Sequence, residues 1–263
     1  VDRITGPVPI SAGSVPYGTA DVAGSPLSVS LAARGYVEEE YFIAGHAATH
    51  GRDSRDARVV LQQAQPYVTR ILVRRPSDPK HFSGVVHLEP MHPQFGTTTT
   101  WAATADYLLR AGHAYVAVAA GADANTRNLS VARGVPVAGP MVAQAFDPRR
   151  YAALHWPEDD GIRWDVIQQV VGVLRSGGQR DVRVLGGAKA RRVLVSGWSF
   201  SGSLWRTWIN EGFHERAARA GARIDGYLIG IGAKYASDPQ SLTRVDIRWL
   251  IDGIHRKDPK EIV

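Results

Sequence analysis

The sequence contains no cysteine, which excludes disulfide bonds, thiolate metal ligands and a cysteine nucleophile together. It also lacks any apolar run near the roughly 18 residues that a membrane-spanning helix needs, so we expect no membrane span. A chain without cysteine suits either redox compartment, and we favour a secreted or periplasmic location slightly over a cytoplasmic one. The chain opens at Val1 rather than Met, so we expect a trimmed N-terminus, and no signal peptide can be read.

Long basic runs are missing too, although 31 Lys and Arg against 25 Asp and Glu give a net charge of +6. The basic residues stand singly or in pairs, such as Arg74-Arg75, Arg149-Arg150 and Arg191-Arg192, with acids between them. No patch interleaves them with aromatic residues, as nucleic-acid-binding segments do. We therefore expect no nucleic-acid partner.

Hydrophobic patterning predicts one α/β domain over residues 1–263. Strands are expected at 36–44, 67–74, 83–90, 114–120, 192–196, 224–231 and 245–251. Helices are expected at 97–111, 165–175 and about 200–211, with a further one to about 220. This alternation predicts a mostly parallel sheet with helices on both faces, preceded by a β-rich segment over residues 1–66.

Residues 121–160 break this alternation. Gly, Pro and Asn recur there, no period is sustained, and the stretch is far longer than the usual connection of about six residues. Such a segment is either a lid over a site or an excursion packed on the body of the fold. We expect a lid-like insertion.

The sharpest chemical signal is the segment Arg192 to Gly202, RVLVSGWSFSG. An apolar strand leads into a small-X-Ser-X-small pattern centred on Ser199, and a helix follows. In a nucleophile elbow the turn is so tight that larger residues two positions before or after the serine would clash. The turn would expose the Ser199 hydroxyl beside the helix N-terminus, where the N–H of Phe200 can stabilise an oxyanion. A plain Gly/Ser turn shows the same letters, but the flanking strand and helix favour the catalytic interpretation.

The chain resembles the bacterial α/β-hydrolase-domain family in which a β-rich N-terminal segment precedes the catalytic fold. The matching stretches, in the family's order, are GYVEEEYFIAG, TRILVRRPSDPKHFSGVVHLEP, DPRRYAALHWPEDDGIRWDVIQQ and VLGGAKARRVLVSGWSFSG. The resemblance implies an α/β-hydrolase fold and a serine hydrolase acting on a small-molecule carboxylic ester. Relatives often have Glu-Ser-Gln where this chain has Trp198, Ser199 and Phe200. The more apolar elbow suggests a hydrophobic acyl or alcohol group, with Trp198 in the substrate pocket.

The catalytic acid and base are harder to place. The chain order in this fold is serine, acid, histidine. Asp252 follows the last expected strand and is the candidate acid, with Asp238 as the fallback, although Asp252 also suits an ordinary turn. Only His214 and His255 follow the serine; we expect His214 at the surface, and His255 stands too close to Asp252. We therefore expect the catalytic histidine outside this sequence, the alternative being a complete chain that lacks its base.

The second oxyanion donor should come from the loop after the strand at 83–90. Pro90 and Pro93 have no N–H, which leaves Met91 or His92. We assign the donor to Met91 and place His92 in the substrate pocket. A loop that prolines merely rigidify is the alternative for both residues.

No metal or cofactor is expected. His46 and His50 would share a face on a helix, but they follow a strand-like run and no third ligand completes a metal site. The acidic residues 158–160 precede a helix and would stabilise its N-terminus. The Gly186-Gly187 pair makes no phosphate-binding fingerprint. Two rival functions remain, an acyltransferase using the same elbow and an inactive binding protein of the same fold, and the oligomeric state is left open.

Overall fold

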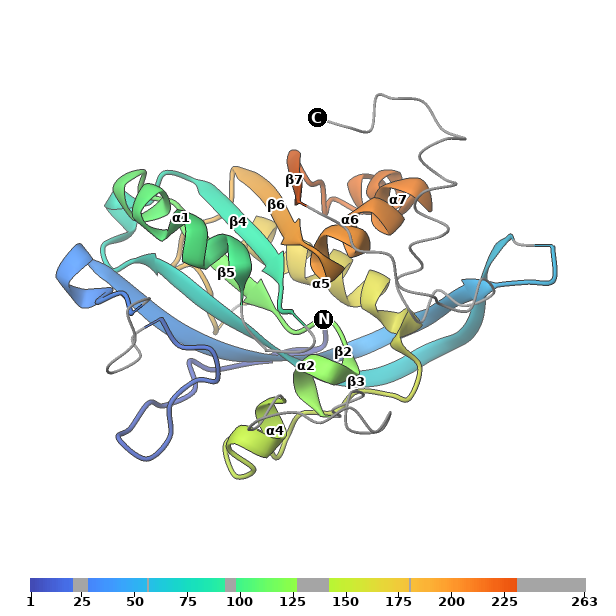
Figure 1. The fold of residues 1–263 in the computed structure, drawn as a ribbon, viewed down its shortest axis with the longest axis horizontal. Helices are drawn as coiled ribbons and strands as arrows, with labels where there is room; N and C mark the ends of the chain where they lie inside the picture. Colours follow the sequence, from blue (N-terminus) through green and yellow to red (C-terminus); the bar gives the residue numbers. More distant parts are fainter. Residues whose placement is uncertain (21–27, 56, 93–97, 127–141, 180, 231–263) are drawn as a thin grey trace.

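The computed structural model describes residues 1–20, 28–55, 57–92, 98–126, 142–179 and 181–230. Within these ranges, one seven-stranded sheet runs through the molecule in the order β1-β2-β3-β5-β4-β6-β7 (Figure 1). Its strands are β1 (Arg3–Thr5), β2 (Tyr36–Arg52), β3 (Arg58–Pro76), β4 (Val85–Pro90), β5 (Ala114–Val118), β6 (Arg192–Trp198) and β7 (Gly226–Gly230).

The helices flank this sheet. They are α1 (Thr99–Arg110), α2 (Ala122–Asn125), α4 (Ala143–Phe146), α5 (Arg163–Ser176), α6 (Phe200–Asn210) and α7 (Phe213–Arg219). Short 3-10 turns lie at Ala32–Arg34, Pro79–His81 and Asp160–Ile162. None of the helices in the described ranges has the length and apolarity needed to cross a lipid bilayer.

The sheet is parallel in one half and antiparallel in the other. Strands β5, β4, β6 and β7 pair in parallel. Strands β1, β2 and β3 pair antiparallel, and β3 also pairs antiparallel with β5. The expected mostly parallel sheet is therefore right only for the second half, because β2 and β3 form a hairpin and a short connection imposes antiparallel pairing. The β-rich N-terminal segment joins the sheet, since β3 continues through residue 66.

Helices cover both faces, as expected (Figure 1). Along β5, Tyr115 and Ala117 pack into the cluster that holds Leu108 of α1. The alternate residues Val116 and Val118 pack into the larger cluster that contains the buried side chains of α5 and α6. This period of two is what a strand buried on both sides requires.

The described part of residues 121–160 is packed against the antiparallel half of the sheet. Arg150 forms a 2.7 Å ion pair with the fully buried Glu40, and Tyr151 donates its hydroxyl proton to the same carboxylate. Val68 of β3 and His155 exchange backbone hydrogen bonds. These residues therefore form a packed excursion rather than part of the lid-like insertion expected over 121–160, and residues 127–141 of that stretch lie outside the described ranges.

Candidate active site

Ser199 is the single residue between β6 and α6, as the strand, turn and helix pattern predicts. Its backbone has φ 55° and ψ −113°, in the left-handed half of conformational space that a residue with a Cβ rarely adopts. Such a conformation costs about 1–3 kcal/mol and persists only where surrounding structure enforces it. The Ser199 N–H donates to the carbonyl oxygen of Gly230 in β7 at 3.2 Å, which helps to fix the turn.

Small residues make this turn possible. A Cβ at Gly197 would lie 2.5 Å from the carbonyl of Ser201, and a Cβ at Gly202 would overlap the carbonyl oxygen of Gly230. Ser201 closes the turn, because its hydroxyl accepts the Trp198 N–H at 2.9 Å and donates to the Trp198 carbonyl at 3.1 Å. The size requirement therefore has a direct steric origin at both glycines.

The first turn of α6 supplies backbone donors beside the serine. Helical hydrogen bonding starts with the Ser203 N–H, which donates to the Ser199 carbonyl at 2.9 Å. The Phe200 N–H precedes this bond and has no acceptor among the described residues. The helix dipole adds positive potential at the same place. A negatively charged oxygen next to Ser199 would be stabilised there.

Met91 does not offer the amide that the sequence analysis assigned to it. Its N–H donates to the Val118 carbonyl at 2.8 Å and so continues the pairing of β4 with β5. Its side chain is 4% exposed, and its sulfur accepts a 3.1 Å hydrogen bond from Arg70. The amide is already used within the sheet, so we withdraw Met91 as an oxyanion donor.

Aromatic and cationic side chains surround the elbow. The ring of His92 lies 6.4 Å from the ring of Phe200, and burial lowers the pKa of His92. Trp198 is 43% exposed. Arg163 also reaches the elbow, with its guanidinium carbon 5.8 Å from the centre of the Phe200 ring. The sequence analysis missed Arg163, and no local pattern in the sequence marks its approach to Phe200.

The acidic residues before α5 hold this arginine. Asp160 pairs with Arg163 at 2.6 Å and accepts the Ala122 N–H at 2.9 Å. Asp159 accepts the Gly161 N–H at 2.7 Å and so caps the short turn that leads into the helix. The expected stabilisation of a helix start therefore applies to Asp159, whereas Asp160 connects that start to α2.

The described residues do not place the acid and the histidine that are expected to act with Ser199. Asp238, Asp252 and His255 lie outside the described ranges. His214 lies on α7, where it is half-buried rather than at the surface, and its Nδ1 is 2.7 Å from the hydroxyl of Tyr227. No histidine of the described ranges forms a hydrogen bond with the Ser199 hydroxyl.

His46 and His50 lie on β2, not on a helix. On an extended strand, residues four apart are separated by about 13 Å, too far to share one ion. They pair with different carboxylates, His46 with Asp2 at 2.7 Å and His50 with Asp165 at 2.8 Å. The described residues contain no group of three or more His, Asp or Glu side chains that could hold a metal ion.

A serine held in a strained turn between a parallel strand and a helix is the defining arrangement of the α/β-hydrolase class. The chain belongs to the alpha/beta hydrolase domain family, whose model matches residues 4–256. The comparison with curated proteins gives no match.

Solved structures show more distant similarity. The esterase Est22 is 15% identical, with 78% of this chain and 47% of that chain covered and a TM-score of 0.39. Brefeldin A esterase, a bacterial homologue of human hormone-sensitive lipase, is 17% identical, with 83% and 44% covered and a TM-score of 0.38. A Klebsiella pneumoniae protein assigned as a dienelactone hydrolase is 15% identical, with 76% and 65% covered and a TM-score of 0.36. The chain thus spans less than two thirds of each of these structures.

Proposed function

We propose that the protein is a serine hydrolase that cleaves a small-molecule carboxylic ester through an acyl-enzyme on Ser199. The observation that carries the proposal is the strained backbone of Ser199, with φ 55°, at the junction of β6 and α6. Backbone strain of this kind concentrates at functional sites, because packing alone gives no reason to retain it. Membership of the alpha/beta hydrolase domain family supports the same class of reaction.

The proposed reaction follows from the groups beside the serine. The Ser199 hydroxyl oxygen attacks the ester carbonyl while a base removes its proton, and the Phe200 N–H stabilises the negatively charged carbonyl oxygen. The intermediate collapses, the alcohol leaves with a proton, and water then releases the acid from Ser199. A histidine is the proposed base and Asp252 the proposed acid.

The substrate's acyl or alcohol group is proposed to be apolar. Trp198 exposes 43% of its surface at the elbow, and the rings of His92 and Phe200 lie close together beside it. Burial lowers the pKa of His92 and so favours its uncharged imidazole. An apolar chain would lose little on entering such surroundings.

A fluorophosphonate probe tests the proposal on the natural full-length protein. The wild type should be labelled on the peptide that contains Ser199, and Ser199→Ala should abolish labelling and lower kcat/KM for p-nitrophenyl esters by about 10⁴-fold or more. Ser77→Ala is the matched control, because this exposed serine lies after β3, away from the elbow. A folded wild type that resists the probe would identify an inactive member of the fold and overturn the proposal.

A further inference from the structure

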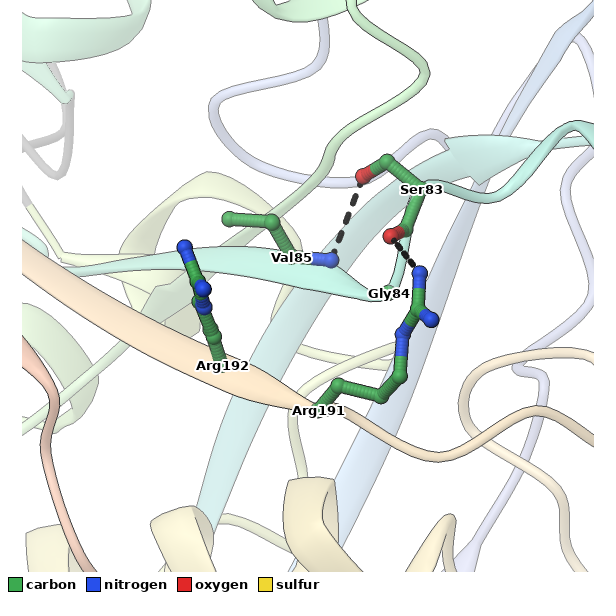
Figure 2. Close-up of a pocket in the computed structure, with 5 residues that line it drawn as sticks. All are labelled: Ser83, Gly84, Val85, Arg191 and Arg192. Atoms are coloured by element: carbon green, nitrogen blue, oxygen red, sulfur yellow. Dashed lines mark hydrogen bonds between the residues drawn. The ribbon is translucent and has the colours of Figure 1, made fainter.

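We propose that the amino end of the parallel strands holds a second site, which binds a small molecule carrying a phosphate group. A cavity of about 360 Å³ opens there, lined by Ser83, Gly84, Val85, Arg191 and Arg192. Figure 2 shows the two arginine side chains rising on either side of Gly84 and Val85.

This cavity is separate from the elbow. It lies where β4 and β6 begin, at Val85 and Arg192, whereas Ser199 directly follows the last residue of β6. Strands rise about 3.3 Å per residue, so a strand of this length places the two sites about 20 Å apart. A ligand in the cavity would therefore not touch the proposed nucleophile.

Arg191 is held in place by the backbone rather than by an acid. Its side chain donates to the Ser83 carbonyl at 2.6 Å, and its own N–H donates to the Gly84 carbonyl at 2.8 Å. A Cβ at Gly84 would overlap the Arg191 side chain, so this close approach needs glycine, which here has φ +84°. The guanidinium is thus oriented before any ligand arrives.

Neither cavity arginine is neutralised within the described residues. Arg191 and Arg192 form no ion pair with any described carboxylate. The acid adjoining this segment is Asp225, which accepts the Val193 N–H at 2.8 Å and pairs with Arg175 and, at 2.6 Å, with Arg223.

Asp225 adds no net negative charge to the cavity. Although burial opposes its ionisation, the Val193 N–H and the two arginines lower the pKa of Asp225, and its single charge is opposed by both cations. Arg175 also donates to the Arg191 carbonyl at 2.8 Å, so the excess cation lies directly beside the cavity. The local field therefore favours an anion.

The hydrogen-bond donors that line the cavity, chiefly the guanidinium groups of Arg191 and Arg192, suit a phosphate group. Guanidinium groups bind phosphate oxygens through parallel hydrogen bonds, and this geometry gives both strength and orientation. The Ser83 hydroxyl, 2.7 Å from His113 and 3.2 Å from the Val85 N–H, lies in the same lining. Pockets for small molecules have volumes of about 300–1,000 Å³, and the cavity volume of about 360 Å³ lies within this range.

Titration calorimetry with pyrophosphate, at an ionic strength matched by chloride, tests the site. The wild type should bind saturably, and Arg192→Gln should weaken binding by about tenfold or more, because it removes a charged donor. Arg149→Gln, which removes the same charge from an exposed position in another part of the chain, should change affinity less than twofold. Ser199→Ala should bind pyrophosphate as the wild type does, whatever happens to hydrolysis.

Two outcomes would overturn the site. One is the absence of saturable binding to the wild type, and the other is equal weakening by Arg149→Gln and Arg192→Gln, which would indicate a diffuse charge effect. Arg192 is the preferred target because its side chain is exposed and makes no described contact on which folding depends. Circular dichroism of each variant excludes a folding defect as the cause.

Discussion

The antiparallel and parallel halves of the sheet bury different kinds of side chain. In the antiparallel half, Glu40 of β2 is fully buried between Arg70 and Arg150, at 2.7 Å from each. In the parallel half, every residue of β5 is buried and apolar apart from the hydroxyl of Tyr115. The buried acid of that half, Glu89, is held by hydrogen bonds from Thr100 and Tyr115 rather than by arginine.

This difference suggests that the buried charges set strand register in the antiparallel half, whereas the candidate sites lie at the ends of the parallel strands. Charged residues that face each other across β2 and β3, such as Glu38 and Arg74, specify one pairing of the two strands. The parallel strands need no such device, because they are buried on both faces and connected through helices. Their ends are therefore available for other groups, the Ser199 elbow at one end and the arginine-lined cavity at the other.

The largest effect on stability is expected from Glu40→Gln in the antiparallel half. The substitution leaves two buried arginines without their carboxylate, which should lower the free energy of unfolding by about 3–5 kcal/mol. Glu39→Gln on the same strand is the control, because its pair with Arg75 is partly exposed and should contribute about 1 kcal/mol or less. Urea denaturation measures both, and equal losses would show that burial of the ion pair does not set its importance.

The next largest effect is expected at the elbow, from Gly202→Ala. The new Cβ would overlap the Gly230 carbonyl, so β6, α6 and β7 must shift, at a cost of about 3 kcal/mol. Gly172→Ala is the matched control, a glycine in the interior of α5 with no atom near the site of the Cβ, where alanine should stabilise by about 0.5–1 kcal/mol. Thermal denaturation should move the two melting temperatures in opposite directions, and a shared direction would contradict the steric account.

Local pattern predicted the parallel half well. The apolar run at 114–120 corresponds to β5, and the strand and helix around Ser199 lie where the pattern places them. The antiparallel half was predicted less completely, because β2 and β3 extend well beyond the predicted strands at 36–44 and 67–74. Their outer parts are fixed by distant contacts, such as the bond from the Ala48 N–H to Asp165 on α5, which no local period encodes.

In the candidate site, too, some features follow from local sequence and others depend on distant contacts. The Ser199 turn depends mostly on residues within three positions of it, which the sequence shows directly, and also on the distant Gly230 carbonyl, which it does not. The Met91 amide depends on how far β4 pairs with β5, and that register is a long-range property. Arg163 reaches Phe200 only because α5 packs beside the elbow, so its position could not be derived from spacing alone.

Low pH should weaken the junction between the two halves of the sheet, where Asp165 of α5 binds His50 and the Ala48 N–H of β2. Burial alone would raise the pKa of this carboxyl group, but hydrogen bonds from His50, from Arg216 and from the backbone outweigh burial and lower it to about 2. A pKa below the unfolded value of 3.8 means that Asp165 stabilises the fold above about pH 4 and that this contribution is lost as pH falls toward 2. Between pH 5 and 2.5 the wild type should lose about 2 kcal/mol through this group.

Unfolding free energies at the two pH values check this loss. In Asp165→Asn the same drop in pH should cost about 2 kcal/mol less than in the wild type, since the titrating group is gone. Asp106→Asn, at an exposed position paired with Arg34, should keep the wild-type dependence. Indistinguishable pH profiles for Asp165→Asn and the wild type would show that the junction does not rely on this carboxylate.

The smallest effect is expected from Trp198→Ala, which tests whether the parallel half presents an apolar surface to substrate. The exposed indole should contact a longer acyl chain but not an acetyl group, so the ratio of kcat/KM for p-nitrophenyl octanoate to that for the acetate should fall about fivefold, or about 1 kcal/mol. Tyr107→Ala removes another exposed aromatic side chain, on α1, and should leave this ratio unchanged. If the wild type cleaves polar esters much faster than octanoate, the apolar character of the elbow has no role in substrate choice, and Trp198 serves only to pack against Gly230.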